Sequence, residues 1–253
     1  KELFRAYPGR IACVILEAEK YEPPAAGFLC GLEELAHENG AVFILDEMIT
    51  GFRWHLGGAQ KRYGIVPDLS AFGKALGNGF SVSALAGKRE IMELGGLDHD
   101  KERVFLLSAT HGAETPGLAA ALATRRFYKE NPVVEGLYAR GRRLAEGVNG
   151  ASAALGLAEY VSVVGPDCCS VYTPRDGEGK PSQAFRTLFL QETMKRGLLM
   201  PSSIVSYAHT DADIDRTVEA VSEALVVYRR ALDEGIGKYL DGAPVKPVFR
   251  KFN

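Results

Sequence analysis

Two charged residues stand at points in the sequence where a parallel sheet would bind a ligand. Asp46 directly follows the apolar run Ala41–Leu45, and Lys74 comes shortly after a second apolar run, Leu69–Phe72. In an open α/β sheet ligands bind beyond the carboxyl ends of the strands, so both side chains are placed to meet one. A second role stays open for Asp46, since an aspartate in such a position also serves to cap a helix or loop.

Glycines surround Lys74 in the stretch Gly73–Gly79. Such a loop bends freely and can direct the lysine amine into a cleft, where it could form an imine or carry a proton. Most lysines in loops are simply exposed to solvent, so Lys74 alone is weak evidence for a functional site. The evidence becomes stronger when Lys74 and Asp46 are taken together. The loop is not a phosphate-binding P-loop, because Ala75 follows the lysine where that motif requires serine or threonine.

Apolar runs and helical periodicity indicate how these two residues are held. Ile11–Leu16 and Ala41–Leu45 are continuous apolar runs typical of strands covered on both faces, and Ala26–Asn39 between them has its leucines at helical spacing. Strand, helix and strand with short connections form a βαβ unit, which predicts a parallel sheet. Gly40 is placed as the C-terminal cap of the helix. Further strands are expected over Leu69–Phe72, Val82–Ala86 and Val104–Leu107.

The pattern changes from about Thr115 to longer helices and shorter strands. We therefore divide the chain into a mostly parallel α/β domain, residues 1–130, and a smaller α+β domain, residues 131–253. Helices are expected over Thr115–Lys129, Val133–Val148, Ser182–Arg196 and Asp211–Leu232. Short strands are expected over Tyr160–Val164, Cys169–Tyr172 and Leu198–Met200, and a loosely ordered tail over Asp241–Asn253.

The composition is that of a globular protein without a strong electric field. Of its 253 residues 46% are hydrophobic and 25% charged, and 30 basic against 32 acidic side chains leave a net charge of -2. We therefore expect neither nucleic acid nor a membrane as a partner, and no apolar run is long enough to span a bilayer. The four cysteines lack metal-ligand spacing and are expected to be buried, reduced thiols of a cytoplasmic protein.

Four motifs, taken together, resemble the core of the class III aminotransferases, and most closely their glutamate-1-semialdehyde aminomutase branch. The motifs are Asp46–Arg53, Leu56–Gln60, Pro67–Leu69 and Gly73–Gly79. The resemblance runs from about Ile11 to Ala123 and continues more faintly to Ala208–Asp215, which looks like the family's entry into its last helix. An aspartate and a lysine in this order, each inside its matching motif, make the resemblance specific.

This resemblance implies a fold type I enzyme that depends on pyridoxal 5'-phosphate. Lys74 would form the Schiff base with the cofactor and carry the proton between substrate carbon and cofactor carbon. Asp46 would pair with the pyridinium nitrogen and keep it protonated. Met48 would pack against the cofactor ring, although ordinary core packing explains a methionine at this position equally well. Residues 1–130 would then be the C-terminal part of the large cofactor-binding domain.

A further cofactor contact is implied by the segment Ser108–Pro116. It looks like the family segment that reaches into the neighbouring subunit and binds the cofactor phosphate through a threonine. The family's threonine falls on His111, and Thr110 offers the hydroxyl one residue earlier, so both side chains are candidates. A structural capping role competes for Thr110. The phosphate contact would make the protein a homodimer with shared active sites.

Three departures from the family pattern limit what the resemblance implies. Ile49 stands where many members have a glutamine near the cofactor, although the aminomutase branch also lacks it. Pro201–Tyr207 is shorter than its counterpart in the aminomutase and lacks the Phe-Glu pair expected there, which argues against glutamate-1-semialdehyde as substrate. The family also has a long region ahead of the strand at Ile11. We therefore expect an N-terminal portion on the same chain or on another one.

The predicted function is pyridoxal phosphate-dependent transfer of an amino group between a small-molecule amino donor and a carbonyl acceptor. An aminomutase, which retains its amino intermediate, is the alternative within the same fold. A catalytically silent fragment or partner subunit that only completes a dimer is a second alternative, which the intact Lys74 and Asp46 oppose. A nucleotide-binding α/β protein is disfavoured because no GxGxxG motif opens the first helix.

Overall fold

The computed structural model describes residues 1–104 and 112–246, and the chain folds into two compact units, 1–134 and 135–253. Unit 1 contains an open sheet with short helices, and unit 2 is built mainly from long helices. Within the described part of the chain, no helix is long and apolar enough to cross a membrane.

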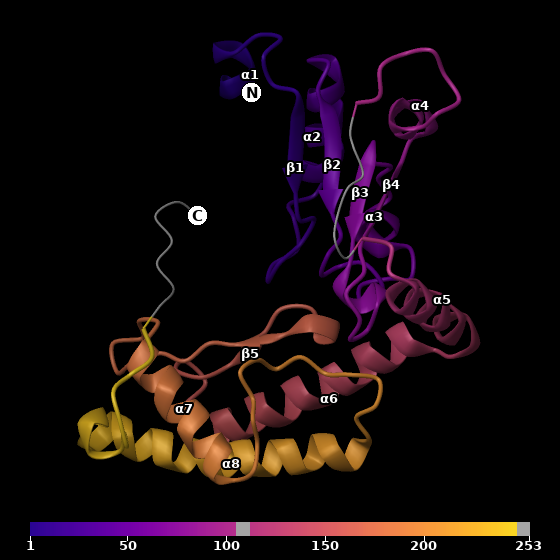
Figure 1. Cartoon of the computed structure of the whole chain (residues 1–253). Helices are drawn as coiled ribbons and strands as arrows, with labels where there is room; N and C mark the ends of the chain where they lie inside the picture. Colours follow the sequence, from indigo (N-terminus) through magenta and orange to yellow (C-terminus); the bar gives the residue numbers. More distant parts are fainter. Residues whose placement is uncertain (105–111, 247–253) are drawn as a thin grey trace. The chain divides into compact units, whose positions relative to one another are not determined.

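A four-stranded sheet in the order β1-β2-β3-β4 forms the centre of unit 1 (Figure 1). Its strands are β1 (Cys13–Leu16), β2 (Val42–Asp46), β3 (Leu69–Phe72) and β4 (Ala84–Gly87). The first three strands are parallel, and β4 runs antiparallel to β3. The predicted βαβ unit is confirmed, because α2 (Phe28–Glu38) joins the parallel strands β1 and β2. Gly40 follows α2 with a φ of 69°, the left-handed conformation that glycine adopts beyond a helix end.

The other helices of unit 1 are mostly short. They are α1 (Glu2–Ala6), α3 (Gly58–Tyr63), η1 (Lys74–Leu76), α4 (Arg89–Met92), η2 (Glu93–Gly95) and α5 (Thr115–Glu130). The predicted helix from Thr115 is confirmed by α5. The sequence did not predict α3, because its paired glycines and polar residues read as a turn. The strand expected at Val104–Leu107 lies almost wholly outside the described residues, and Val104 itself is not in a strand.

Helices cover one face of the sheet of unit 1. Phe43 and Leu45 point to this face from β2 and are fully buried. They belong to a hydrophobic core with Leu29 and Ala36 of α2 and Ala59 of α3. Since side chains alternate along a strand, Val42, Ile44 and Asp46 point to the opposite face.

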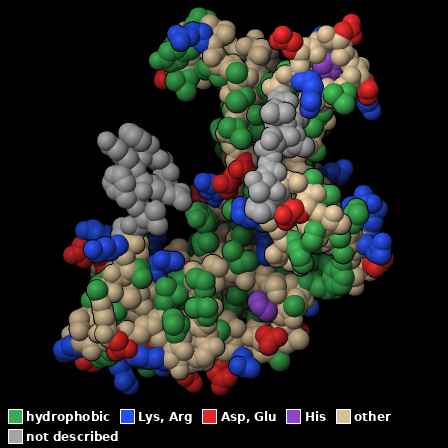
Figure 2. All heavy atoms as spheres, in the orientation of Figure 1, with side chains coloured by type: hydrophobic (Ala, Val, Ile, Leu, Met, Phe, Trp, Pro, Cys, Tyr) green, Lys and Arg blue, Asp and Glu red, His purple; other side chains and the backbone are tan. Residues whose placement is uncertain are grey.

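That opposite face is open. In the parallel register Ile15 of β1 lies beside Ile44 of β2, and Ile15 is 59% exposed. On the far strand Leu85 lies beside Ala71 and is 51% exposed. Hydrophobic side chains are visible at the surface in this part of the molecule (Figure 2). The expectation that these strands are covered on both faces is therefore wrong for the described residues. An apolar run indicates that burial of both faces would stabilise the strand, but it does not indicate which polypeptide covers them.

A buried carboxylate fastens the amino ends of the central strands. Asp68, 5% exposed, precedes β3 and accepts hydrogen bonds from the Phe43 N–H at 2.7 Å and from His37 Nε2 at 2.8 Å. The Lys88 ammonium lies 2.6 Å from its other oxygen. Burial alone raises the pKa of Asp68, but Lys88, the Phe43 N–H and His37 together outweigh burial and hold this pKa below its usual range.

We expect the stability of unit 1 to depend on pH through Asp68. A carboxyl whose pKa is lowered by folding stabilises the folded state above its unfolded pKa, about 4, and this contribution is lost as pH falls through the folded pKa. Asp68→Asn should therefore destabilise the chain strongly at neutral pH and progressively less toward pH 3. Urea unfolding at both pH values measures this difference, with the exposed Asp98→Asn as control. A difference that does not change with pH would contradict the prediction.

Unit 2 packs its helices around a second core. Its elements are α6 (Val133–Ala154), β5 (Val163–Val164), η3 (Asp167–Cys169), β6 (Val171–Tyr172), α7 (Gln183–Lys195), α8 (Asp211–Glu234) and η4 (Ile236–Lys238). The helices α6 and α8 run alongside one another (Figure 1). Arg143 of α6 forms two hydrogen bonds of 2.8 Å with Asp215 of α8. Thr210 and Asp213 cap α8 reciprocally, which explains the abrupt start of this helix.

Three expectations for unit 2 and the cysteines need correction. Leu198–Met200 forms no strand, because β5 and β6 pair only with each other among the described residues. The first part of the expected loose tail is held on α7, where the Val245 N–H donates to the Thr187 hydroxyl at 2.9 Å. Cys13 and Cys30 are exposed, whereas Cys168 and Cys169 are buried; all four are free thiols. The expected burial therefore holds only for the second pair.

Candidate functional site

The structure brings Asp46 and the lysine loop to the same edge of the sheet. Asp46 is the last residue of β2 and lies in register with Ala71 of the parallel strand β3. β3 ends at Phe72, and Lys74 opens the short turn η1 after Gly73. Carboxyl ends of parallel strands share one edge of a sheet, which is where α/β folds bind ligands.

Only one oxygen of the Asp46 carboxylate accepts a hydrogen bond from the described residues. Its Oδ1 accepts a hydrogen bond of 2.9 Å from the Met48 N–H. Among the residues that the structure describes, its Oδ2 has no hydrogen-bond partner. The side chain is half-buried and points to the open face of the sheet, on the side of Ile44. One oxygen of Asp46 thus stays available to a donor that the described chain does not supply.

Lys74 has an unusual backbone conformation and an exposed side chain. Its φ of 44° lies in the left-handed region, where a residue with a Cβ is strained. The side chain is exposed, and no carboxylate of the described chain forms an ion pair with it. Backbone strain of this kind is concentrated at functional sites. The loop therefore holds Lys74 in a costly conformation with its amine left available.

Met48 links the two sides of the site. Its side chain is half-buried and packs on Gly73, where an added Cβ would come within 2.8 Å of the Met48 Sδ. Phe52, with a φ of 64°, adds a second link through its ring, which lies 5.9 Å from that of Phe72 in an edge-to-face arrangement. The segment after Asp46 and the segment that carries Lys74 are therefore packed together.

The predicted phosphate-binding residues lie outside the described part of the chain. Thr110 and His111 both fall within 105–111. Their role stays a prediction.

Glu47 is a buried acid of this region whose role is not evident from the sequence. It is fully buried and accepts hydrogen bonds from the Thr50 hydroxyl and from the Ala59 and Gln60 N–H groups, the last two at 2.9 Å. These amides belong to the first turn of α3, so the carboxylate meets the positive end of this helix. The sequence carries one signal for this role, an acid followed closely by a threonine and by two adjacent glycines. Glu47 and Ala59 are twelve positions apart, which makes their pairing hard to recognise from the sequence.

A second buried acid, Glu19, binds residues that follow Glu47 in the sequence. It accepts a hydrogen bond of 2.6 Å from Trp54 Nε1 and another from the Tyr63 hydroxyl. Burial, together with this bond to Glu19, raises the pKa of Tyr63 to about 12. The tyrosine thus stays a hydrogen-bond donor over the whole physiological pH range. Trp54 has a structural role here that its position in the sequence did not reveal.

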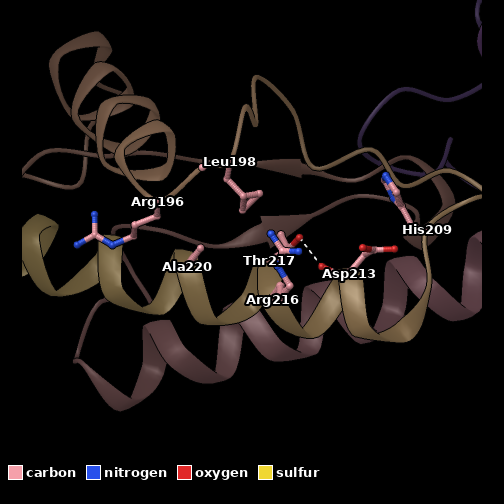
Figure 3. A pocket seen from close by; sticks show the side chains of 8 residues that line it. Arg196, Leu198, His209, Asp213, Arg216, Thr217 and Ala220 are labelled. Atoms are coloured by element: carbon pink, nitrogen blue, oxygen red, sulfur yellow. Dashed lines mark hydrogen bonds between the residues drawn. The ribbon is translucent and has the colours of Figure 1, made fainter.

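Unit 2 contains a cavity of about 200 Å³ between the end of α7 and the start of α8 (Figure 3). It is lined by Arg196, Gly197, Leu198, His209, Asp213, Arg216, Thr217 and Ala220. Arg196 is occupied by Glu192 and Glu223, each at 2.9 Å. The Thr210 N–H and hydroxyl lower the pKa of Asp213 by binding its carboxylate. None of the predicted site residues lines this cavity, and no group of possible metal ligands occurs among the described residues.

Comparison with known proteins identifies the family of the chain. The family model of the class-III aminotransferases matches residues 1–225. The chain belongs to the class-III aminotransferases. Its α/β architecture, with a mixed, mostly parallel sheet and flanking helices, is that of fold type I, as predicted.

Curated relatives of this class-III aminotransferase chain are named glutamate-1-semialdehyde 2,1-aminomutase. The relative from Desulfitobacterium hafniense is 37% identical over 89% of this chain and 55% of its own length. The relative from Desulforudis audaxviator is 35% identical over 88% of this chain and 54% of its own length. The chain thus spans about half the length of the curated relatives that it matches.

Solved transaminase-type structures share the fold. The FumI protein of Sphingopyxis sp. MTA144, solved in its PLP internal aldimine form, superposes with a TM-score of 0.80 at 27% identity, over 92% of this chain and 56% of that protein. Here again the match covers little more than half of the relative. The resemblance to the family and its aminomutase branch is thereby confirmed.

Proposed function

We propose that this chain carries the lysine and aspartate of a pyridoxal 5'-phosphate-dependent amino-transfer site that acts between a small-molecule amino donor and a carbonyl acceptor. The observation that carries the proposal is the shared sheet edge of Asp46 and the Lys74 loop. Both side chains there have hydrogen-bonding capacity that the described residues leave unused. A scaffold protein has no need of either feature.

The residues present fit the cofactor. Pyridoxal phosphate supplies an aldehyde that a lysine amine can bind and a pyridine ring that withdraws electrons from the substrate. Lys74 offers an exposed amine without an ion-pair partner in the described chain, and Asp46 offers its Oδ2. Met48, packed on Gly73, offers an apolar surface beside them. Thr110 and His111 remain our candidates for the phosphate.

Each residue then has a definite task. The Lys74 Nζ would hold the cofactor and would move the proton at the reacting carbon of the substrate. The Asp46 Oδ2 would accept a hydrogen bond from the protonated ring nitrogen and so would keep that nitrogen protonated. Met48 would help to exclude water beside the cofactor. The charge on Asp46 acts at its full strength only where water is excluded, because a low local dielectric strengthens such a pair.

Further polypeptide must complete this site, and we propose that it covers the open face of the sheet. The Asp46 side chain points to that face, where Ile15 and Leu85 are more than half exposed. Relatives of about twice the matched length have enough additional chain to cover it. We propose a homodimer with shared active sites, an N-terminal portion on the same or another chain, and a reducing, cytoplasmic location in which the free thiols persist.

An aminomutase is the second candidate, and the names of the curated relatives favour it. The short stretch Pro201–Tyr207, without the Phe-Glu pair of that branch, favours amino transfer to a separate acceptor. The two candidates differ in what leaves the enzyme. Release of a 2-oxo acid from L-alanine or L-glutamate supports transfer. Isomerisation of glutamate-1-semialdehyde without release of a second product supports the aminomutase.

Borohydride reduction tests the cofactor and the lysine together. We expect a single pyridoxyl adduct on Lys74, located by peptide mass, after incubation with pyridoxal phosphate and reduction. The chain is tested alone and in the assembly in which it occurs, because the open face predicts weak binding by the chain alone. Adducts spread over several exposed lysines, or none in either preparation, would leave the silent-partner alternative in its place.

A further inference from the structure

Glu47 is a fully buried carboxylate that has no cationic partner among the residues the structure describes. Its two oxygens accept from the Ala59 N–H, the Gln60 N–H and the Thr50 hydroxyl. No Lys, Arg or His of the described chain forms an ion pair with it. A buried charge is costly unless hydrogen bonds satisfy it, and here three donors from two separate segments do so.

The backbone at Gly51 and Gly58 packs closely against Glu47. Gly58 has a φ of 77°, and a Cβ added there would come within 2.8 Å of the Glu47 Oε2. A Cβ added at Gly51 would come within 2.7 Å of the Glu47 carbonyl oxygen. Both glycines thus allow the backbone to close on this one residue. The turn over residues 47–51 and the start of α3 therefore depend on the Glu47 side chain.

The backbone of Glu47 extends this arrangement to the neighbouring strand. Its N–H donates to the Ala71 carbonyl of β3 at 2.9 Å, and its carbonyl accepts from the Gly51 N–H at 2.9 Å. The Met48 N–H comes from the same turn and donates to the Asp46 Oδ1. The direction of that N–H, and with it the orientation of the Asp46 carboxylate, is set by the turn that Glu47 closes.

We propose that Glu47 is a positioning residue, which fixes the turn after β2 so that the Asp46 carboxylate presents its Oδ2 to the ligand. This inference rests on the proposed function of Asp46. Glu47 itself touches no ligand, because its side chain is fully buried and used by Thr50, Ala59 and Gln60.

The first test uses Glu47→Gln in the cofactor-free chain. A glutamine offers one acceptor oxygen, and its NH₂ group faces an N–H donor where the second oxygen was. We expect amide exchange of Met48, followed by NMR, to become roughly tenfold faster relative to the rest of unit 1, about the effect of losing one net hydrogen bond. Thr50→Val should produce the same change more weakly, and Thr50→Ser, which retains the hydroxyl, should not.

Asp68→Asn is the matched control. Asp68 is also a buried acid with three donors, but it lies at the amino end of the strands, away from Asp46. It should lower the stability of unit 1 and accelerate exchange broadly, without singling out Met48. If Glu47→Gln and Asp68→Asn change the Met48 amide equally relative to its neighbours, Glu47 is only structural and the proposal is overturned.

The second test uses the cofactor-loaded assembly. Glu47→Gln should shift the pH at which the absorbance of the bound cofactor changes, in the same direction as Asp46→Asn, and Asp68→Asn should leave it in place. An adduct on Lys74 with an unshifted titration in Glu47→Gln overturns the positioning role but leaves the proposed function intact. The absence of an adduct on Lys74 in the parent removes the proposed function, and the Met48 exchange still decides whether Glu47 orients Asp46.

Discussion

Replacement of Lys74 by alanine is expected to abolish amino transfer. The variant loses the amine that we propose to hold the cofactor and to carry the proton at this edge of the sheet. General acid-base catalysis alone contributes up to about 10⁴-fold, so we expect a loss of roughly that size or larger. Release of 2-oxo acid from L-alanine or L-glutamate measures the rate in the complete assembly. The same variant should give no borohydride adduct.

The matched control for this variant is Lys61→Ala. Lys61 is exposed on α3 in the same unit and belongs to none of the proposed contacts. We expect its activity and its adduct on Lys74 to equal those of the parent. Folding of the Lys74 variant is expected to be unimpaired, because its side chain is exposed and its strained φ of 44° is no worse for alanine. Activity within a few-fold of the parent in Lys74→Ala would remove the lysine from the mechanism.

The positions of Asp46 and Lys74 could be predicted because they follow from strand ends. An apolar run that ends in a charged residue marks where a buried strand reaches the sheet edge, and two parallel strands bring their ends to one edge. The order of acid and lysine within their motifs then identified the family. This part of the site depends on local sequence, and the register of Asp46 with Ala71 agrees with it.

The support of the site could not be predicted in the same way. Glu47 meets Ala59 and Gln60, and Glu19 meets Trp54 and the Tyr63 hydroxyl, across long separations in sequence. Such pairings follow from how the loop folds over the sheet edge, and no periodicity records them. Glutamates next to apolar strands look like surface residues in the sequence, since burial of a charge is rare without partners.

Burial of the sheet was predicted from hydrophobicity, and it is wrong for one face. The apolar runs of β1 and β2 indicate strands that need two covered faces. The described chain covers only the face of Phe43 and Leu45, while Ile15 on the other face stays exposed. The hydrophobicity of the strands thus indicates that both faces need cover, but it does not indicate which polypeptide supplies it. The strand predicted at Leu198–Met200 is absent for a similar reason, because three apolar residues do not determine which strand they would pair with.

Replacement of Asp46 by asparagine should leave the fold intact and slow amino transfer by about 10²-fold to 10³-fold, the effect of removing one preorganised electrostatic partner. The amide oxygen can keep the hydrogen bond from the Met48 N–H, so the turn is retained. The NH₂ group then stands where the Oδ2 was, and it donates a hydrogen bond to the ring nitrogen where the carboxylate would accept one. The ring nitrogen of the proposed cofactor would then lose its proton, and with it most of its capacity to accept electrons from the substrate.

Two further measurements on Asp46→Asn separate this electrostatic role from a structural one. The variant should still form the borohydride adduct on Lys74, because the lysine amine is untouched, and its urea unfolding should match the parent closely. Asp68→Asn, at the opposite end of the same strands, should show the reverse behaviour: lower stability with nearly unchanged turnover. Turnover of Asp46→Asn within a few-fold of the parent would mean that Asp46 caps the turn at the end of β2 and does not hold the proton on the cofactor ring.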